Sequence, residues 1–261
     1  MIEFYDNDMS VCAQKVRLVL AAKDLDYKRH TLNLRAGDQF RPEYLKLNPG
    51  AVVPTIVDKG VPLIESTAII AYLDDAYPEP SLKPADPLDR ATMWRWMILP
   101  DASLHDACGI TSFALAFRHQ LARLEPAALE AHYAKMPDAR RRKHVRSVVE
   151  MGLDAPGVGE ALRTYKSVID ALARQLEKSK WLAGNSYSLA DTTMVPYVLR
   201  LEHLGLDWFW SDAPQVADWM ARCKGMPEYS AISDHIDPKY LALMGSLPAD
   251  QHDRVKEIVN G

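Results

Sequence analysis

The first part of the chain alternates between the apolar spacing of strands and that of helices. A short apolar run at 2–5 predicts a strand, and from Val11 onward the apolar residues recur at helical intervals. Polar residues of this helix, such as Lys15 and Arg17, are expected on its other faces. Alternating apolar and charged residues at 26–34 predict a second strand. A strand, a helix and a strand in this order indicate that the two strands pair in parallel.

A second group of elements follows. Residues 42–47 predict a short helix, and 52–57 resume as a strand. A turn at 58–60 leads into another strand, so we expect a hairpin. Because Pro62 has no N–H to donate, that last strand is predicted to lie at a sheet edge. Apolar residues at helical spacing in 69–76 then predict a helix with one buried stripe.

Strand patterns stop beyond residue 77. Four of the 17 prolines fall within 77–87, which predicts a linker, and the apolar positions after it keep helical spacing. Predicted helices cover residues 88–120, 127–134, 159–176, 190–204 and 213–224. Ser188 and Asp191 have the spacing of a capping box at the start of one of them. The second part of the chain is therefore predicted to be all-helical.

Composition and charge narrow the class of protein. With 261 residues, 48% hydrophobic and 25% charged residues, and a net charge of -4, the sequence is typical of an ordinary globular protein. A basic run at 140–144 stands alone, and we interpret it as a solvated helix face. Neither nucleic acid nor a membrane surface is expected as a partner. We see no export signal and no apolar segment of membrane length, so we expect a cytoplasmic protein.

The cysteines give no sign of a disulfide or a metal site. There are 3 of them, Cys12, Cys108 and Cys223, an odd number at wide spacing. They form no CxxC pair and no zinc-type pattern. We therefore expect reduced thiols and no bound metal.

Three local motifs occur in an order that is typical of one family. They are SVCAQKVR at 10–17, Asn48-Pro49 with Val53-Pro54, and Glu65-Ser66 ahead of a helix. Their order and spacing resemble the glutathione S-transferase superfamily, in a bacterial, serine-type form. The resemblance implies a thioredoxin-like α/β glutathione-binding domain at 1–78, a linker at 79–88, and an all-α helical bundle with the hydrophobic substrate pocket at 89–261.

The same resemblance assigns the residue that activates the glutathione thiol. Ser10 occupies the place of the hydroxyl donor beside a helix N-terminus, where a hydrogen bond and the helix dipole stabilise a thiolate. An ordinary N-cap is the alternative role for Ser10. Cys12 is the alternative catalytic residue, and it would make the protein a thiol transferase that forms mixed disulfides. We favour Ser10 and interpret Cys12 as a buried, inert core cysteine.

Further residues are implied to bind glutathione. Val53 would pair through its main chain with the cysteinyl part of glutathione, because Pro54 in this family is cis. The helix start at Glu65 and Ser66 suits the γ-glutamyl end, with Ser66 as a plain N-cap as the alternative. Gln39 is the candidate for the glycine carboxylate. Arg41 and Lys46 are further, cationic candidates for the same carboxylate. Val52 occupies the position where many family members carry a side chain that makes a polar contact with glutathione.

The helix after the linker is implied to close the pocket for the second substrate. Its candidate pocket residues are Met97, Asp101, Leu104, His105 and Cys108. Pro100 is expected to kink or interrupt this helix. His105 is either an ordinary surface or core histidine or a proton donor for a leaving group.

We therefore expect a glutathione transferase that conjugates glutathione, as co-substrate, to an apolar or aromatic electrophile. Residues 118–159 enlarge the helical domain as in the lignin β-aryl ether cleaving members, so a glutathione-dependent β-etherase is one alternative. The second alternative, motivated by Val52, is a non-catalytic interaction module. Apolar residues on more than one face of the helices near 66–76 and 89–97 predict a homodimer.

Overall fold

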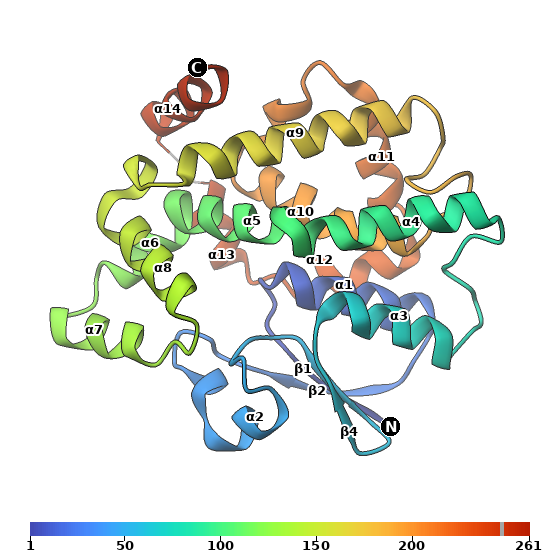
Figure 1. Cartoon of the computed structure of the whole chain (residues 1–261), viewed down its shortest axis with the longest axis horizontal. Helices are drawn as coiled ribbons and strands as arrows, with labels where there is room; N and C mark the ends of the chain where they lie inside the picture. Colours follow the sequence, from blue (N-terminus) through green and yellow to red (C-terminus); the bar gives the residue numbers. More distant parts are fainter. Residues whose placement is uncertain (246–247) are drawn as a thin grey trace.

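The computed structural model describes residues 1–245 and 248–261. Figure 1 shows a small sheet with its helices beside a larger group of helices. The order along the chain is the predicted one: strands occur only in the first part of the described chain, and helices follow. The prediction of an α/β first domain and an all-α second domain is confirmed.

The sheet has four strands in the order β2-β1-β3-β4. They are β1 (Ile2–Asp6), β2 (Tyr27–Thr31), β3 (Thr55–Asp58) and β4 (Val61–Leu63). The predicted parallel pairing of β1 and β2 is confirmed, and β3 runs antiparallel to both β1 and β4. Pro62 lies in β4 at the sheet edge, as predicted. β3 begins only at Thr55 instead of Val52, because the chain bends at the cis Val53–Pro54 peptide.

Helices cover both faces of the sheet. One face carries α1 (Val11–Ala22) and α3 (Ser66–Ala76), and its core is built from the buried residues Phe4, Val16, Val19, Leu20, Ile56 and Ile69. The other face carries α2 (Pro42–Leu47), where the ring of Tyr44 lies 5.7 Å from that of Tyr5. A 3-10 turn, η1 (Asp38–Phe40), precedes α2.

The polar face of α1 is not exposed to solvent, which corrects the sequence interpretation. Lys15 and Arg17 both have 0% exposure. The reason is that α1 is covered on its second side by helices of the other domain, α10 and α12. Arg17 is compensated there by an ion pair of 3.1 Å with Asp6. Lys15 has a different environment, described below.

The helical domain begins with one long helical run. It comprises α4 (Pro87–Leu99), a π-helical segment (Pro100–Leu104), α5 (His105–Ser112), a second π-helical segment (Phe113–Phe117) and α6 (Arg118–Leu121). This is the helix predicted for 88–120, and its regular hydrogen bonding changes at Pro100 as expected.

Eight further helices complete the described part of the domain. They are α7 (Pro126–Ala134), α8 (Ala139–Met151), α9 (Val158–Leu176), α10 (Leu189–His203), α11 (Pro214–Lys224), α12 (Ser230–Ser233), α13 (Pro238–Gly245) and α14 (Ala249–Asn260), with short 3-10 turns η4 (Gly152–Asp154), η5 (Asp207–Trp210) and η6 (Pro227–Tyr229). The sequence analysis gave no ranges for α8 or for α12 to α14. No helix within the described residues is long and apolar enough to cross a membrane.

The predicted capping box at the start of α10 is confirmed. Asp191 accepts hydrogen bonds from the N–H of Ser188 at 3.0 Å and from the indole of Trp219 at 2.8 Å. The Ser188 hydroxyl in turn accepts from the helix backbone. These bonds fix the buried start of α10, the helix that carries Tyr197 to the site.

The helices of the 118–159 stretch form a small core of their own. Buried Tyr133, Met136, Val145 and Val149 pack together, and Phe40 of the first domain packs against them. Figure 1 shows α7 and α8 beside the end of the molecule where α2 lies. The enlarged part of the helical domain therefore contacts the turn that carries Gln39.

Candidate active site

The start of α1 is the point where side chains from both domains converge. Sγ of Cys12 lies 3.5 Å from Nδ1 of His105 on α5 and 3.8 Å from the hydroxyl of Tyr197 on α10. The same His105 nitrogen lies 3.2 Å from the Tyr197 hydroxyl. A thiol, an imidazole and a phenol therefore form one hydrogen-bonded cluster across the domain boundary.

The surroundings of Cys12 favour its ionised form. Burial by itself would raise the pKa of this thiol, but the positive charges of Lys15 and His105 and hydrogen bonds from His105 and Ser66 lower it to about 6. The charge of Cys12 in turn raises the pKa of His105. Cys12 is half-buried and contacts His105 and Tyr197, so it is not the buried core cysteine that the sequence analysis favoured.

Lys15 is a fully buried cation beside this cluster. Its Nζ donates to the Thr67 hydroxyl at 3.4 Å and lies 5.7 Å from the centre of the Tyr197 ring. The neighbouring cations of α1 have carboxylate partners, Asp6 for Arg17 and Asp74 for Lys23, but Lys15 has no ion pair within 1–245 and 248–261. A buried ammonium group without a carboxylate favours the arrival of an anion.

Ser10 is the N-cap of α1. Its oxygen accepts a hydrogen bond of 3.2 Å from the N–H of Ala13. A hydroxyl that accepts in this way keeps its own hydrogen free for a second partner. The N-cap role is therefore observed, and it is compatible with donation to a bound sulfur atom.

The loop before β3 is held by side chains of α2 and its end. Asn48 donates to the carbonyl of Val52 at 2.9 Å and to the hydroxyl of Thr55 at 3.2 Å, and the hydroxyl of Tyr44 also donates to the Val52 carbonyl. The Val53–Pro54 peptide between them is cis, as the family resemblance implied. The side chains of Tyr44 and Asn48 thus fix the loop on either side of Val53.

The start of α3 lies next to the thiol. Ser66 is buried, and its hydroxyl helps to lower the pKa of the Cys12 thiol. It is the first residue of α3, not its N-cap. The N-cap is Glu65, whose φ of 68° is rare for a residue with a side chain. Such backbone geometry is concentrated at ligand sites. Ser66 is therefore not the N-cap, although Glu65 is exposed to solvent, as that alternative expected.

Gln39 lies in a turn and is mostly buried. Its amide donates to the carbonyl of Leu34 at 3.0 Å, while its side-chain oxygen has no partner among the described residues. Arg41 is exposed and pairs with Asp38 at 2.7 Å, and Lys46 is exposed on α2. Gln39 therefore supports its own turn, and Arg41 and Lys46 face solvent.

The predicted substrate-pocket residues divide into two groups. Met97 and Leu104 are fully buried, and Cys108 has 3% exposure, so all three belong to the core of the helical domain. Their burial gives no support to a pocket-lining role, because the inner side of α4 and α5 is covered by α9 and α10. Asp101 and His105 are exposed, and His105 contacts the thiol cluster.

Two residues of this site, Tyr197 in the cluster and Lys15 beside it, were missed by the sequence analysis. Tyr197 stood inside an apolar helical stretch, where an aromatic residue is ordinary core. Lys15 stood on what looked like a polar face. No local signal distinguishes either residue, since their importance comes from contacts between helices far apart in sequence.

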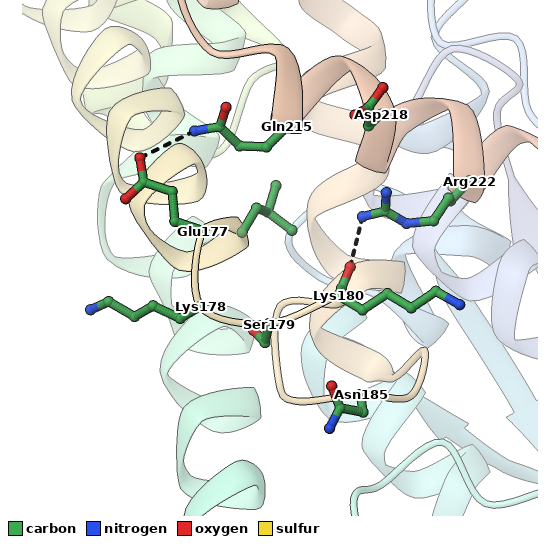
Figure 2. Close-up of a pocket in the computed structure, with 9 residues that line it drawn as sticks. Glu177, Lys178, Ser179, Lys180, Asn185, Gln215, Asp218 and Arg222 are labelled. Atoms are coloured by element: carbon green, nitrogen blue, oxygen red, sulfur yellow. Dashed lines mark hydrogen bonds between the residues drawn. The ribbon is translucent and has the colours of Figure 1, made fainter.

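A separate surface hollow of about 440 Å³ lies between the end of α9 and α11 (Figure 2). It is lined mainly by polar and charged side chains, and two hydrogen bonds cross it, from Gln215 to Glu177 at 3.4 Å and from Arg222 to the carbonyl of Lys180 at 2.7 Å. None of its lining residues belongs to the cluster around Cys12.

Comparison with known proteins gives matches for both domains. The profile of the glutathione S-transferase N-terminal domain matches residues 9–76, and that of the C-terminal domain matches residues 116–227. Glutathione S-transferase Z1 of Arabidopsis thaliana is 45% identical over 96 residues, which cover 37% of this chain and only 43% of that protein. Glutathione S-transferase F13 of the same plant is 26% identical over 241 residues, or 89% of this chain and 94% of the relative.

A solved structure shares the fold over nearly the whole chain. The β-etherase LigF from Sphingobium sp. strain SYK-6 superposes with a TM-score of 0.81 and 24% identity, covering 90% of this chain and 98% of that one. The two matching domain profiles occur in the order in which the structure places an α/β domain and a helical domain. The chain therefore belongs to the glutathione S-transferase superfamily.

Proposed function

We propose that this protein is a glutathione transferase in which the glutathione thiolate attacks an apolar or aromatic electrophile. The observation that carries the proposal is the cationic site at the start of α1, which lowers the pKa of a thiol, Cys12, to about 6. A site that favours a sulfur anion suits a reaction whose nucleophile is a thiolate. Its position beside Ser66, at the start of α3, supports glutathione as the thiol that binds there.

Each residue has a defined role in this proposal. The Ser10 hydroxyl donates its free hydrogen to the glutathione sulfur, and Lys15 supplies the nearby positive charge. Glu65 and Ser66 hold the γ-glutamyl end, and Val53 pairs with the peptide through its main chain. Sulfur then forms a bond to carbon of the electrophile while the bond to the leaving group breaks, and the leaving group departs with the electron pair.

His105 is placed to serve the leaving group. It is exposed on one side, reaches the thiol cluster on the other, and its pKa is raised by the charge of Cys12. A protonated imidazole near the reacting sulfur can transfer its proton to an anion that leaves. A phenolate released by ether cleavage is one such anion, and LigF, a β-etherase, shares the fold.

Product analysis distinguishes the two reactions. The protein is incubated with glutathione and either an aryl halide or a model β-aryl ether. Conjugation of the halide supports the transferase, and release of phenol from the ether assigns the β-etherase reaction. Activity on the halide without any phenol release would remove the β-etherase alternative, and inactivity on both would contradict the transferase proposal.

A second candidate function is favoured by the low pKa of Cys12. In a thiol transferase the Cys12 thiolate attacks a sulfur of glutathione disulfide, one glutathione stays on Cys12 as a mixed disulfide, and the other leaves as thiolate. Intact mass after treatment with glutathione disulfide tests this. One added glutathione that is absent from a Cys12→Ser variant supports the candidate, and an unmodified mass removes it.

We also propose a homodimer, but on fewer residues than the sequence suggested. Met93, Trp96, Met97, Ile69, Ile70 and Leu73 are buried within the chain itself. Trp94 remains 42% exposed and Ile98 55% exposed on α4, and Val61 is 57% exposed at the sheet edge. Because such apolar residues favour a partner surface, light scattering is expected to give twice the 29.3 kDa of one chain. A mass of one chain would contradict the dimer.

A further inference from the structure

Arg200 is a buried guanidinium without an acidic partner. It lies on α10 with 4% exposure, and no ion pair of this residue occurs within the described ranges. One Nη donates to the hydroxyl of Ser112 on α5 at 3.0 Å, and the other donates to the carbonyl of Met9. The group also lies 5.4 Å from the centre of the Phe117 ring. Its two hydrogen bonds therefore go to two different segments, α5 and the residue just before Ser10.

Burying this charge is costly compared with an apolar side chain of similar volume. An ion taken out of water needs compensation, and a methionine would fill the same space without that need. The Nε of Arg200 even lacks a hydrogen-bond partner among the residues described. The arrangement is therefore better explained by what the guanidinium holds than by stability alone.

Arg200 connects the same three elements that meet at the thiol. Cys12, His105 and Tyr197 come from the start of α1, from α5 and from α10. Met9, Ser112 and Arg200 come from the same places, because Met9 precedes Ser10 directly. Tyr197 and Arg200 are i and i+3 on one helix, and His105 and Ser112 are i and i+7 on another, so each pair shares a face.

The three carbonyls that directly precede Ser10 each accept a hydrogen bond from a buried side chain. Arg17 donates to the carbonyls of Asn7 and Asp8, and Gln14 also donates to Asp8. These two side chains belong to α1 itself. Only the carbonyl of Met9, the last before Ser10, is bonded by a side chain of the helical domain.

We propose that Arg200 is a positioning residue that ties the segment carrying Ser10 and Cys12 to the helices carrying His105 and Tyr197. Loss of the bond to Met9 lets the first turn of α1 shift relative to the helical domain. Ser10 and Cys12 then lose their alignment with His105 and Tyr197. The importance for turnover rests on the proposed transferase function. The effect on Cys12 does not, since that thiol can be followed by itself.

The test follows the reactivity of Cys12 in the full-length protein. Alkylation by iodoacetamide is measured against pH, with mass spectrometry to locate the label, and kcat and KM for glutathione are measured in parallel. Arg200→Met, which keeps the length but not the bonds, is expected to lower alkylation at pH 6 to 7 and kcat by roughly tenfold or more, with KM for glutathione nearly unchanged. Arg200→Lys, which can still donate to Met9, is expected to recover most of the loss.

Arg222→Met is the matched control. Arg222 likewise donates to a main-chain carbonyl, that of Lys180, and lies 5.4 Å from the centre of an aromatic ring, Trp181, but it borders the distant surface hollow (Figure 2). This variant is expected to leave the Cys12 pH profile unchanged. An equal change in both variants would show a general loss of packing and would overturn the proposal.

Ser112→Ala keeps the test decisive if Arg200→Met does not fold. This change removes one bond of Arg200 but no charge, so we expect the same direction of change at Cys12 and a smaller size. If Arg200→Met folds and keeps wild-type alkylation and kcat, the proposal is overturned. If Arg200→Met does not fold, wild-type alkylation and kcat in Ser112→Ala overturn it. If the wild-type protein conjugates nothing while the Cys12 profile moves as expected, the transferase function fails and the positioning role stands.

Discussion

Cys12 and Cys108 each have a hydroxyl group and a cationic side chain nearby. Burial acts to raise the pKa of both thiols. At Cys12 the charges of Lys15 and His105 outweigh burial and bring the pKa to about 6. At Cys108 burial dominates and the pKa stays raised, although Arg200 and hydrogen bonds involving Ser112 and Tyr165 act against it.

Two cations, Lys15 and His105, lower the pKa of Cys12, whereas Arg200 acts on Cys108. Arg200 directs its donors to Ser112 and to the carbonyl of Met9, whereas Lys15 has one weak bond to Thr67 and no carboxylate partner among the described residues. Cys12 is also half-buried, while Cys108 has 3% exposure. Two cations beside a half-buried thiol thus outweigh burial, while one cation beside a buried thiol does not. This comparison yields four tests.

The largest expected effect is the loss of turnover in Ser10→Ala. This variant tests whether the site stabilises the thiolate of bound glutathione as it stabilises that of Cys12. Ser10→Ala removes the hydroxyl proposed to bond the glutathione sulfur, so kcat should fall by roughly two to three orders of magnitude, the usual scale for one preorganised donor. Glutathione binding should change little. Steady-state kinetics and calorimetry measure the two quantities.

Two further substitutions separate this role of Ser10 from capping. Glycine is tolerated at an N-cap, so Ser10→Gly should preserve the helix start and still lose turnover, while Ser10→Thr should keep much of it. Full activity in Ser10→Ala together with an inactive Cys12→Ala would assign catalysis to Cys12 instead.

The comparison also explains which features the sequence could predict. The capping box of Ser188 and Asp191 was predictable because both partners are local, and α9 was predictable because one of its sides faces solvent. The contact between Cys12 and Tyr197 joins residues 185 positions apart, and no local pattern encodes it. The family motifs indicated Ser10, Val53 and Ser66 as candidates, but the burial of Lys15 depends on how the two domains pack.

Lys15→Met should remove much of the difference between the two cysteines. Without this charge, burial of Cys12 is opposed by His105 and Ser66 alone, so the pKa must rise from about 6. The thiolate forms above the pKa, so the alkylation rate of the wild type is expected to reach half its maximum near pH 6. The variant should need a higher pH to reach half its maximum. The expected loss of alkylation rate at pH 7 is roughly tenfold.

Lys23→Met is the control for Lys15→Met. Lys23 is another buried lysine at the opposite end of α1, where it pairs with Asp74 at 2.7 Å. Its loss should lower stability without moving the Cys12 titration. If both variants, or neither, move the titration, the assignment of the effect to Lys15 is wrong.

The third test concerns glutathione binding at the start of α3. Ser66 lies there beside Cys12, whereas Cys108 has no equivalent residue at a helix start. Ser66→Ala removes a hydroxyl from the start of α3, where we propose that the γ-glutamyl end binds. The dissociation constant for glutathione should rise roughly tenfold, equivalent to about 1.4 kcal/mol. Calorimetric titration measures it, and an unchanged constant would place that end of glutathione elsewhere.

The smallest expected effect is at Cys108 itself. Because this thiol is buried among core residues and its pKa is raised, Cys108→Ala should cost about 1 kcal/mol of unfolding free energy and leave turnover nearly unchanged. Denaturant unfolding and steady-state kinetics measure the two quantities, and the Cys12 alkylation profile should stay as in the wild type. A large loss of turnover with normal stability would instead mean that Cys108 contacts the substrate, as the sequence analysis expected. The core position would then have to open during the reaction.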